Sequence, residues 1–230
     1  MTNEVDYQYS HGHRQRLRMR FIEDLGQSMP DYELLELILC LAIPRRDVKP
    51  LAKRLIKQFG NLNGVLAADI TELRKVGNGL GEGAIAALKL VHACNIRTLK
   101  RQIQRKTIIK SWKELLDYCT VTMGKEKIEQ VRLFFLDHHN FLIRDEVAST
   151  GTVNYTPLFP REIARRALEL GAVSIILVHN HPSGNTKPSQ TDIDMTIELR
   201  DTLRRLEISL HDHVIISSAS YYSFKSHGLI

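Results

Sequence analysis

The feature of this sequence that most constrains its fold is an apolar run that leads through a loop into a helix. AVSIILVHNH (residues 172–181) has the continuous apolar character of a buried strand, and the PSGNTKP that follows is rich in turn formers. SQTDIDMTIELRDTLRRLE (189–207) then has the apolar period of an amphipathic helix. Strands joined to helices in this way are the building unit of α/β proteins, so we expect a sheet flanked by helices.

Further strands and a further helix are predicted on either side of this unit. VRLFFLD (131–137) reads as a buried strand, and NFLIRDEVAS (140–149) reads as its hairpin partner, with Asn140 near the turn. PREIARRALELG (160–171) is predicted as a helix and HDHVIISS (211–218) as a last strand. The second half of the chain is therefore predicted to be α/β, with a mixed sheet between helices.

The first half has a different texture and is predicted to be all helical. DYELLELILCLAI and VKPLAKRLIKQFG have apolar residues at helical spacing, and GNGLGEGAIAALK places glycines between two helices. A helix, a glycine turn and a helix are the layout of a helix-hairpin-helix. We predict a polar N-terminal tail over residues 1–13, a helical domain over 14–106 and the sheet domain over 107–230.

Charge is distributed unequally between the two halves. Residues 1–107 hold 18 Lys and Arg against 11 Asp and Glu, a net +7, whereas residues 108–230 hold 14 against 15. A basic domain suits a polyanion, so contact with DNA through the N-terminal half is one interpretation. A set of solvated helices with a basic tilt is the other.

The composition of the chain predicts a cytoplasmic protein. The first residues, MTNEVDYQYSHGH, have no apolar stretch typical of a signal peptide, and no run of about 18 apolar residues suggests a membrane span. Cys40, Cys94 and Cys119 are scattered and odd in number, which favours reduced thiols in the core over a disulfide framework.

The histidines of HNHPSGNTKPSQTD (179–192) predict a metal site. His179 and His181 are two residues apart on a strand, so both imidazoles face the same side, and Asp192 follows three residues after Ser189. Two histidines and one carboxylate leave a zinc ion one open position, as catalytic zinc sites do. The alternative for the second pair is a helix cap, because Ser-x-x-Asp at a helix start is also a capping pattern.

The same residues carry a family resemblance. His-x-His-Pro, six residues, then Ser-x-x-Asp resembles the motif of the JAMM (MPN+) metalloproteases, and the closer similarity is to the RadC-like (UPF0758) branch, bacterial proteins historically called DNA repair proteins. GTVNYTPLFPREIARRALELGAVSIILVHNHPSG, DHVIISS and RMRFIEDLGQSMPDYELLELIL resemble that branch as well. The similarity extends over residues 14 to 230 and implies an MPN-type mixed sheet of cytidine-deaminase-like architecture, preceded by the helical domain.

The resemblance also implies a chemistry. His179, His181 and Asp192 correspond to the ligands of one Zn²⁺, and Ser189 to a serine that stabilises an oxyanion. The family glutamate that deprotonates water is assigned to Glu146 in IRDEVASTGT, a few residues before Gly151-Thr152, with Glu162 as the competitor. These residues would make a metallopeptidase or isopeptidase acting on a peptide or protein substrate that the sequence does not name.

The resemblance also leaves a second function open. A DNA-repair or recombination protein with an accessory zinc domain is the alternative, although Glu82 directly follows the Gly79-Leu80-Gly81 turn and the family lysine is missing there. A nucleobase deaminase is excluded, because it needs His-x-Glu and Pro-Cys-x-x-Cys and the sequence contains neither motif.

The remaining histidines are predicted to have no part in catalysis. Asp212 and His213 are assigned a structural role or a role in supporting the metal ligands, whereas His11, His13, His138 and His139 are predicted to be solvated. The sequence does not indicate an oligomeric state.

Overall fold

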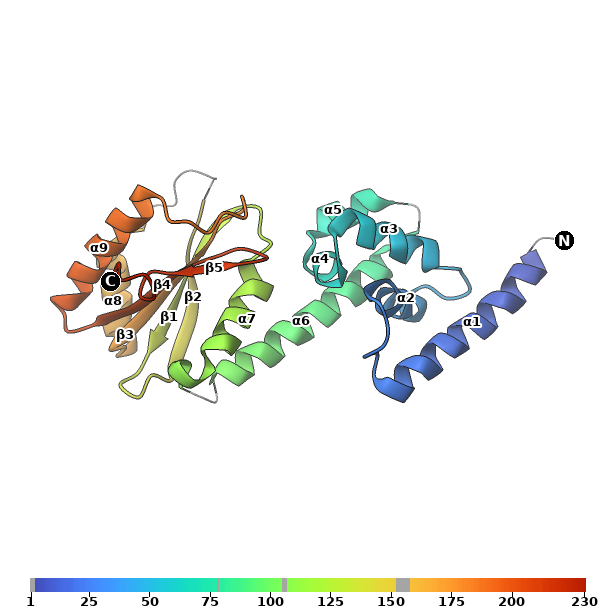
Figure 1. Ribbon diagram of the computed structural model, residues 1–230, viewed down its shortest axis with the longest axis horizontal. Helices are drawn as coiled ribbons and strands as arrows, with labels where there is room; N and C mark the ends of the chain where they lie inside the picture. The colour runs from blue at the N-terminus through green and yellow to red at the C-terminus, as the bar shows by residue number, and fades with distance from the viewer. Residues whose placement is uncertain (1–2, 78, 105–106, 152–157) are drawn as a thin grey trace. The chain divides into compact units, whose positions relative to one another are not determined.

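A computed structural model of the chain describes residues 3–77, 79–104, 107–151 and 158–230 (Figure 1). Thr152 of the Gly-Thr pair and the side chain of His11 lie outside the described residues. The chain divides into two compact units, Met1–Asn95 and Ile96–Ile230. The boundary falls before the predicted residue 106, inside helix α6 (Glu82–Gln104), because the last turns of α6 bury Ile103 in the core of the second unit.

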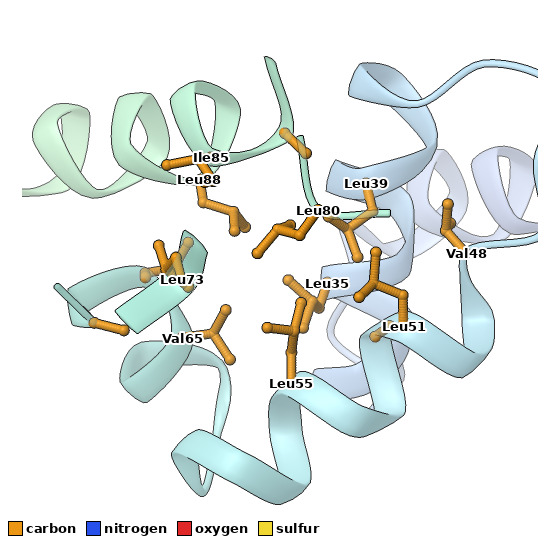
Figure 2. Packing of buried hydrophobic residues seen from close by; sticks show 14 of the residues in the cluster. Leu35, Leu39, Val48, Leu51, Leu55, Val65, Leu73, Leu80, Ile85 and Leu88 are labelled. Atoms are coloured by element: carbon orange, nitrogen blue, oxygen red, sulfur yellow. The ribbon is translucent and has the colours of Figure 1, made fainter. Parts of the chain in front are cut away.

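The first unit consists of helices, as predicted. They are α1 (Asn3–Asp24), α2 (Asp31–Ala42), α3 (Lys49–Phe59), α4 (Leu62–Ala67), α5 (Ile70–Val76) and the first part of α6. Asn61 and Asp69 cap α4 and α5 by accepting backbone N–H groups, as helix-start residues do. Leu35, Leu55 and Leu73 are fully buried at the centre of the unit, where Figure 2 shows them facing one another.

The N-terminal residues differ from the prediction. Instead of a polar tail over residues 1–13, α1 runs without a break from Asn3 to Asp24. Its C-terminal half is anchored by Leu17, which is buried against Met29 and Leu37, and a helix nucleated there extends through polar residues at little cost. His13, predicted to be solvated, is only partly exposed (36%), and its Nε2 lies 2.7 Å from Oε1 of the buried Glu36.

The glycine turn between α5 and α6 is a packed element of this unit. Leu80 is buried and, in Figure 2, points into the cluster that contains Leu39. Gly79 has φ +108°, and a Cβ there would lie 2.0 Å from Nη1 of Arg46, so the backbone passes directly against that guanidinium. Glu82 is held by Arg74 through two contacts of 2.8 and 3.1 Å. The turn is thus closed by packing and an ion pair between neighbouring helices.

The second unit is built on a mixed five-stranded sheet, which confirms the predicted fold class. The strands are β1 (Glu129–Leu136), β2 (Leu142–Gly151), β3 (Ser174–Asn180), β4 (Ser209–Ile216) and β5 (Tyr221–Ser223), in the order β2-β1-β3-β4-β5. β3 and β4 are parallel, whereas β1 pairs antiparallel with both β2 and β3, and β4 with β5. Asn140 lies in the β1–β2 turn with φ +63°, where the sequence placed it.

Helices cover both faces of the sheet (Figure 1). Odd-numbered residues of β1 and β3, such as Leu133 and Leu177, pack with α8 (Pro160–Leu170) and α9 (Gln190–Arg204). Even-numbered residues such as Phe134 and Val178 pack with the end of α6 and with α7 (Trp112–Met123). A short 3-10 turn, Ile108–Ser111, directly precedes α7. Side chains alternate between the faces of a strand, so both faces of β1 and β3 are apolar.

The cysteines agree with the prediction in two of three cases. Cys40 and Cys119 are buried free thiols, and Cys94 is exposed because it lies on the outer side of α6. No transmembrane segment is found among the helices that the structure describes. None of them combines the length and the apolar character that a membrane span requires.

The turn predicts opposite effects for two neighbouring glycines. Gly79→Ala should lower the free energy of unfolding by about 1–3 kcal/mol, because an L-residue at this φ is strained and must also displace Arg46. Gly83→Ala, in the first turn of α6 with open space around it, should instead raise it by about 0.5–1 kcal/mol. Urea unfolding followed by circular dichroism measures both; equal stability of the Gly79→Ala variant and the wild type would contradict the account.

Candidate metal centre

The centre is built at the C-terminal end of the buried strand β3. All seven residues of β3 are buried, and His179 is only 4% exposed. His181 follows immediately after the strand and faces the same way, so its Nε2 lies 2.9 Å from Nε2 of His179. The predicted convergence of the two imidazoles is therefore present.

Asp192 reaches the same point from the first turn of α9. Its Oδ1 lies 3.5 Å from Nε2 of His179, and its Oδ2 lies 3.7 Å from Nε2 of His181. Ser189 caps α9: its Oγ accepts the Asp192 N–H at 3.1 Å, while Asp192 Oδ2 accepts both the N–H and the O–H of Ser189 at 2.7 Å. The two interpretations of Ser-x-x-Asp are compatible, because the capping box is what orients the Asp192 carboxylate.

These three side chains fit a divalent zinc ion. Their ligand atoms all lie within 4.8 Å of one another, and in the described part of the chain they form the group suited to holding a metal. His181 Nδ1 lies 2.7 Å from the main-chain oxygen of Asn185, which can only accept, so Nδ1 donates there and Nε2 is the nitrogen that faces the centre. Two imidazole nitrogens and one carboxylate oxygen are a donor set that zinc prefers.

Burial keeps the centre ready for a metal. It lowers the pKa of His179 to about 4, with His181 acting in the same direction and the Asp192 carboxylate opposing it. Metal ligands must be deprotonated, and a neutral His179 offers its nitrogen without first losing a proton at neutral pH. The free energy needed to remove the His179 ring from water is therefore already spent when the protein folds, before a metal binds.

His213 on β4 lies directly behind His179. Its Nε2 is 2.7 Å from His179 Nδ1, its ring stacks on Phe224 at 4.2 Å between centroids, and burial holds its pKa well below the usual histidine range. Asp212 points elsewhere: it accepts from Ser223 Oγ at 2.5 Å and from the Lys225 N–H at 3.0 Å. His213 thus supports a ligand, and Asp212 holds the segment after β5.

Glu146 is not brought into this group. It lies on β2, opposite Leu133, and both of its carboxylate oxygens are bound by Arg166 of α8, with 3.0 Å between Oε2 and Nε. That guanidinium holds the pKa of Glu146 below its usual value. Its competitor Glu162 is exposed and pairs with arginines of its own helix, Arg161 and Arg165.

Glu129 is an acidic residue beside the centre that the sequence analysis did not single out. Val131 pairs with His179 across β1 and β3. In an antiparallel pair the same register, continued by two residues on each chain, sets Glu129 opposite His181. Burial raises the pKa of Glu129, and among the charges that act on it are Asp192, which raises it, and His181, which lowers it. The sequence does indicate that Glu129 shares a strand face with Val131, two residues later. It does not indicate that this face lies beside His179 and His181, because that depends on the pairing of β1 with β3.

Asn180, between the two histidines, fixes the segment that carries Glu129. Its side chain is buried and points to the opposite face of β3. Oδ1 accepts the Gln130 N–H at 2.8 Å, and Nδ2 donates to the main-chain oxygens of Ile128 at 3.2 Å and Glu126 at 3.3 Å. These bonds hold the backbone on both sides of Glu129.

Comparison with known proteins agrees with this geometry. A family model described as the RadC-like JAB domain matches residues 109–229. The chain belongs to the RadC-like JAB domain family. A UPF0758 protein of Ruegeria pomeroyi is 48% identical over 222 residues, 96% of this chain and 99% of that protein. A second UPF0758 protein, from Rhodobacter capsulatus, is 47% identical over 214 residues, 93% of this chain and 100% of the relative. The resemblance stated from the motif is confirmed, and the match of the JAB domain coincides with the sheet unit.

Acidification should destabilise the zinc-free protein through His179. Its pKa is about 4 in the folded state against the ordinary 6.5, so between these values the unfolded chain binds more protons and stability falls as pH falls. We expect His179→Gln to reduce the loss between about pH 6.5 and 4 by roughly 1–3 kcal/mol. Urea unfolding at stepped pH measures it, with His139→Gln in the exposed β1–β2 turn as the control. Parallel curves for wild type and His179→Gln would refute this assignment.

Proposed function

We propose that the protein is a zinc-dependent hydrolase that cleaves amide bonds in peptides or in isopeptide-linked proteins. The observation that carries the proposal is the convergence of His179, His181 and Asp192, with both Nε2 atoms 2.9 Å apart. When bound there, a zinc ion supplies Lewis acidity, which makes water nucleophilic near neutral pH and polarises a carbonyl. Membership of the RadC-like JAB domain family supports the same chemistry.

Glu129 is proposed as the proton carrier, in place of Glu146. A general base has to reach the centre and to have a pKa moved toward the working pH. The pKa of Glu129 is raised, whereas Glu146 is engaged by Arg166, which lowers its pKa. The carboxylate of Glu129 would take a proton from water and return it to the departing amine.

Ser189 is proposed to serve the centre in two ways. In the structure its hydroxyl donates to Asp192 Oδ2, which orients that ligand. Its position at the start of α9 also suits donation to an oxyanion, and the same proton would have to leave Asp192 Oδ2 to reach it. The oxyanion function thus competes with the capping function for one hydrogen.

The proposal predicts about one zinc per chain. His179→Ala and Asp192→Ala should each abolish tight binding, because each removes one of three protein ligands. Asp194→Ala is the matched control, since Asp194 lies on α9 two residues away, is exposed and bonds to Gln190. Metal analysis of the dialysed proteins reads this out. Zinc-free wild-type protein after growth and dialysis with zinc would overturn the proposal.

The two glutamates predict a direct comparison. Glu129→Gln should keep its zinc and lose about 10²–10⁴-fold in hydrolysis, because it can no longer accept a proton. Glu146→Gln should keep both zinc and most activity, since it changes ion pairs with Arg166 and Arg144 away from the centre. A library of fluorogenic peptide and lysine-isopeptide substrates provides the assay; the reverse order of the two variants would reinstate Glu146.

Association with nucleic acid is the second candidate, and it rests on the net +7 of residues 1–107. The Arg74–Glu82 ion pair at the glycine turn neutralises Glu82 and occupies Arg74, so the turn itself offers a phosphate little net charge. Titration of a fluorescent DNA duplex with the full chain tests it. Affinity that falls steeply as salt rises would support direct binding, and no binding at low salt would eliminate it.

A further inference from the structure

A buried chain of hydrogen bonds leads from His179 back to the helix that carries Asp192. His179 Nδ1 lies 2.7 Å from His213 Nε2, His213 Nδ1 lies 2.6 Å from Thr196 Oγ1, and Thr196 Oγ1 lies 2.5 Å from the main-chain oxygen of Asp192. His213 and Thr196 are 0% exposed, and His179 is 4% exposed. The chain begins and ends on residues of the metal centre.

The donor and the acceptor of each bond in this chain follow from the bond between Thr196 and the main-chain oxygen of Asp192. The Asp192 carbonyl can only accept, and two oxygens 2.5 Å apart need a proton between them, so the single Thr196 hydroxyl proton lies there. Thr196 Oγ1 can then only accept from His213, which puts the His213 proton on Nδ1. Complete burial of the ring favours the neutral form of His213, which has no second proton.

His213 Nε2 is consequently an acceptor, and His179 must donate to it from Nδ1. A neutral His179 then has no proton on Nε2, the atom that faces His181 and Asp192. In the reverse direction, His179 would carry its proton on Nε2 and donate it to His181, which would block the position of a metal. The reverse arrangement would also leave the Thr196 and Asp192 oxygens in contact without a proton between them.

We propose that Thr196 is a positioning residue of the metal centre: its hydroxyl fixes the relay through His213, so that His179 keeps its proton on Nδ1 and presents the Nε2 lone pair to zinc. The inference rests on the proposed function for its metal, but the tautomer that it assigns belongs to the metal-free protein. Thr196 acts through His213, since its hydroxyl bonds to the His213 ring and to the main-chain oxygen of Asp192.

The test uses Thr196→Val, which keeps the shape of the side chain and removes the hydroxyl, with Thr196→Ser as the control that keeps it. Correlation spectra of ¹⁵N-histidine-labelled, zinc-free full-length protein report which nitrogen carries each proton. We expect Nδ1–H at His179 and His213 in the wild type and Thr196→Ser, and a shift of His179 toward Nε2–H in Thr196→Val.

Zinc affinity, measured by competition with a chromophoric chelator, supplies the second readout. Thr196→Val should weaken zinc about 10- to 100-fold, as losses behind a metal-binding histidine do, and Thr196→Ser should restore it to within a few-fold. A wild-type His179 with its proton on Nε2 would overturn the relay, as would a Thr196→Val protein with unchanged tautomers and zinc affinity. Wild-type protein that binds no zinc but shows the assigned tautomers would refute the proposed function alone.

Discussion

Two imidazole nitrogens held 2.9 Å apart beside a carboxylate are the interaction on which the sheet unit's chemistry depends. Electron-rich atoms gathered at the end of a buried strand are unfavourable to one another unless a cation lies between them. The surrounding residues maintain the arrangement: the Ser189 capping box orients Asp192, a main-chain oxygen holds His181, and His213 supports His179 from behind. The geometry is one that a metal completes.

The strand order explains how distant residues meet there. β3 lies between β1, which contributes Glu129, and β4, which contributes His213, while α9 crosses the same face with Asp192 and Thr196. The middle residue of His-Asn-His belongs to this plan as well. Because alternate residues face opposite sides of a strand, Asn180 binds the backbone around Glu129 while its neighbours form the metal centre.

Local pattern was sufficient to predict most of this fold. Apolar runs predicted β1, β2, β3 and β4 to within about two residues, and Gly60 and Gly171 ended their helices with positive φ. α7 and the short β5 were not predicted, and the division inside α6 could not be, because it depends on which core buries Ile103. The extension of α1 over polar residues likewise depends on tertiary anchoring at Leu17.

The site shows the same limit. His179, His181 and Asp192 were predicted because their spacing is local, within one strand, loop and helix. Glu129 was missed because its relation to His181 comes from the pairing of β1 with β3, fifty residues apart in the chain at Gln130 and Asn180. Glu146 faces the same side of the sheet but two strands away from His179, where Arg166 engages it.

The central claim is that one zinc ion binds at His179, His181 and Asp192. X-ray absorption at the zinc edge on the zinc-loaded full chain tests it most directly. The account predicts two imidazole nitrogens and oxygen ligands at about 2.0–2.2 Å, with no sulfur shell. A zinc–sulfur distance of about 2.3 Å, or a spectrum with no imidazole scattering, would place the metal elsewhere and contradict the claim.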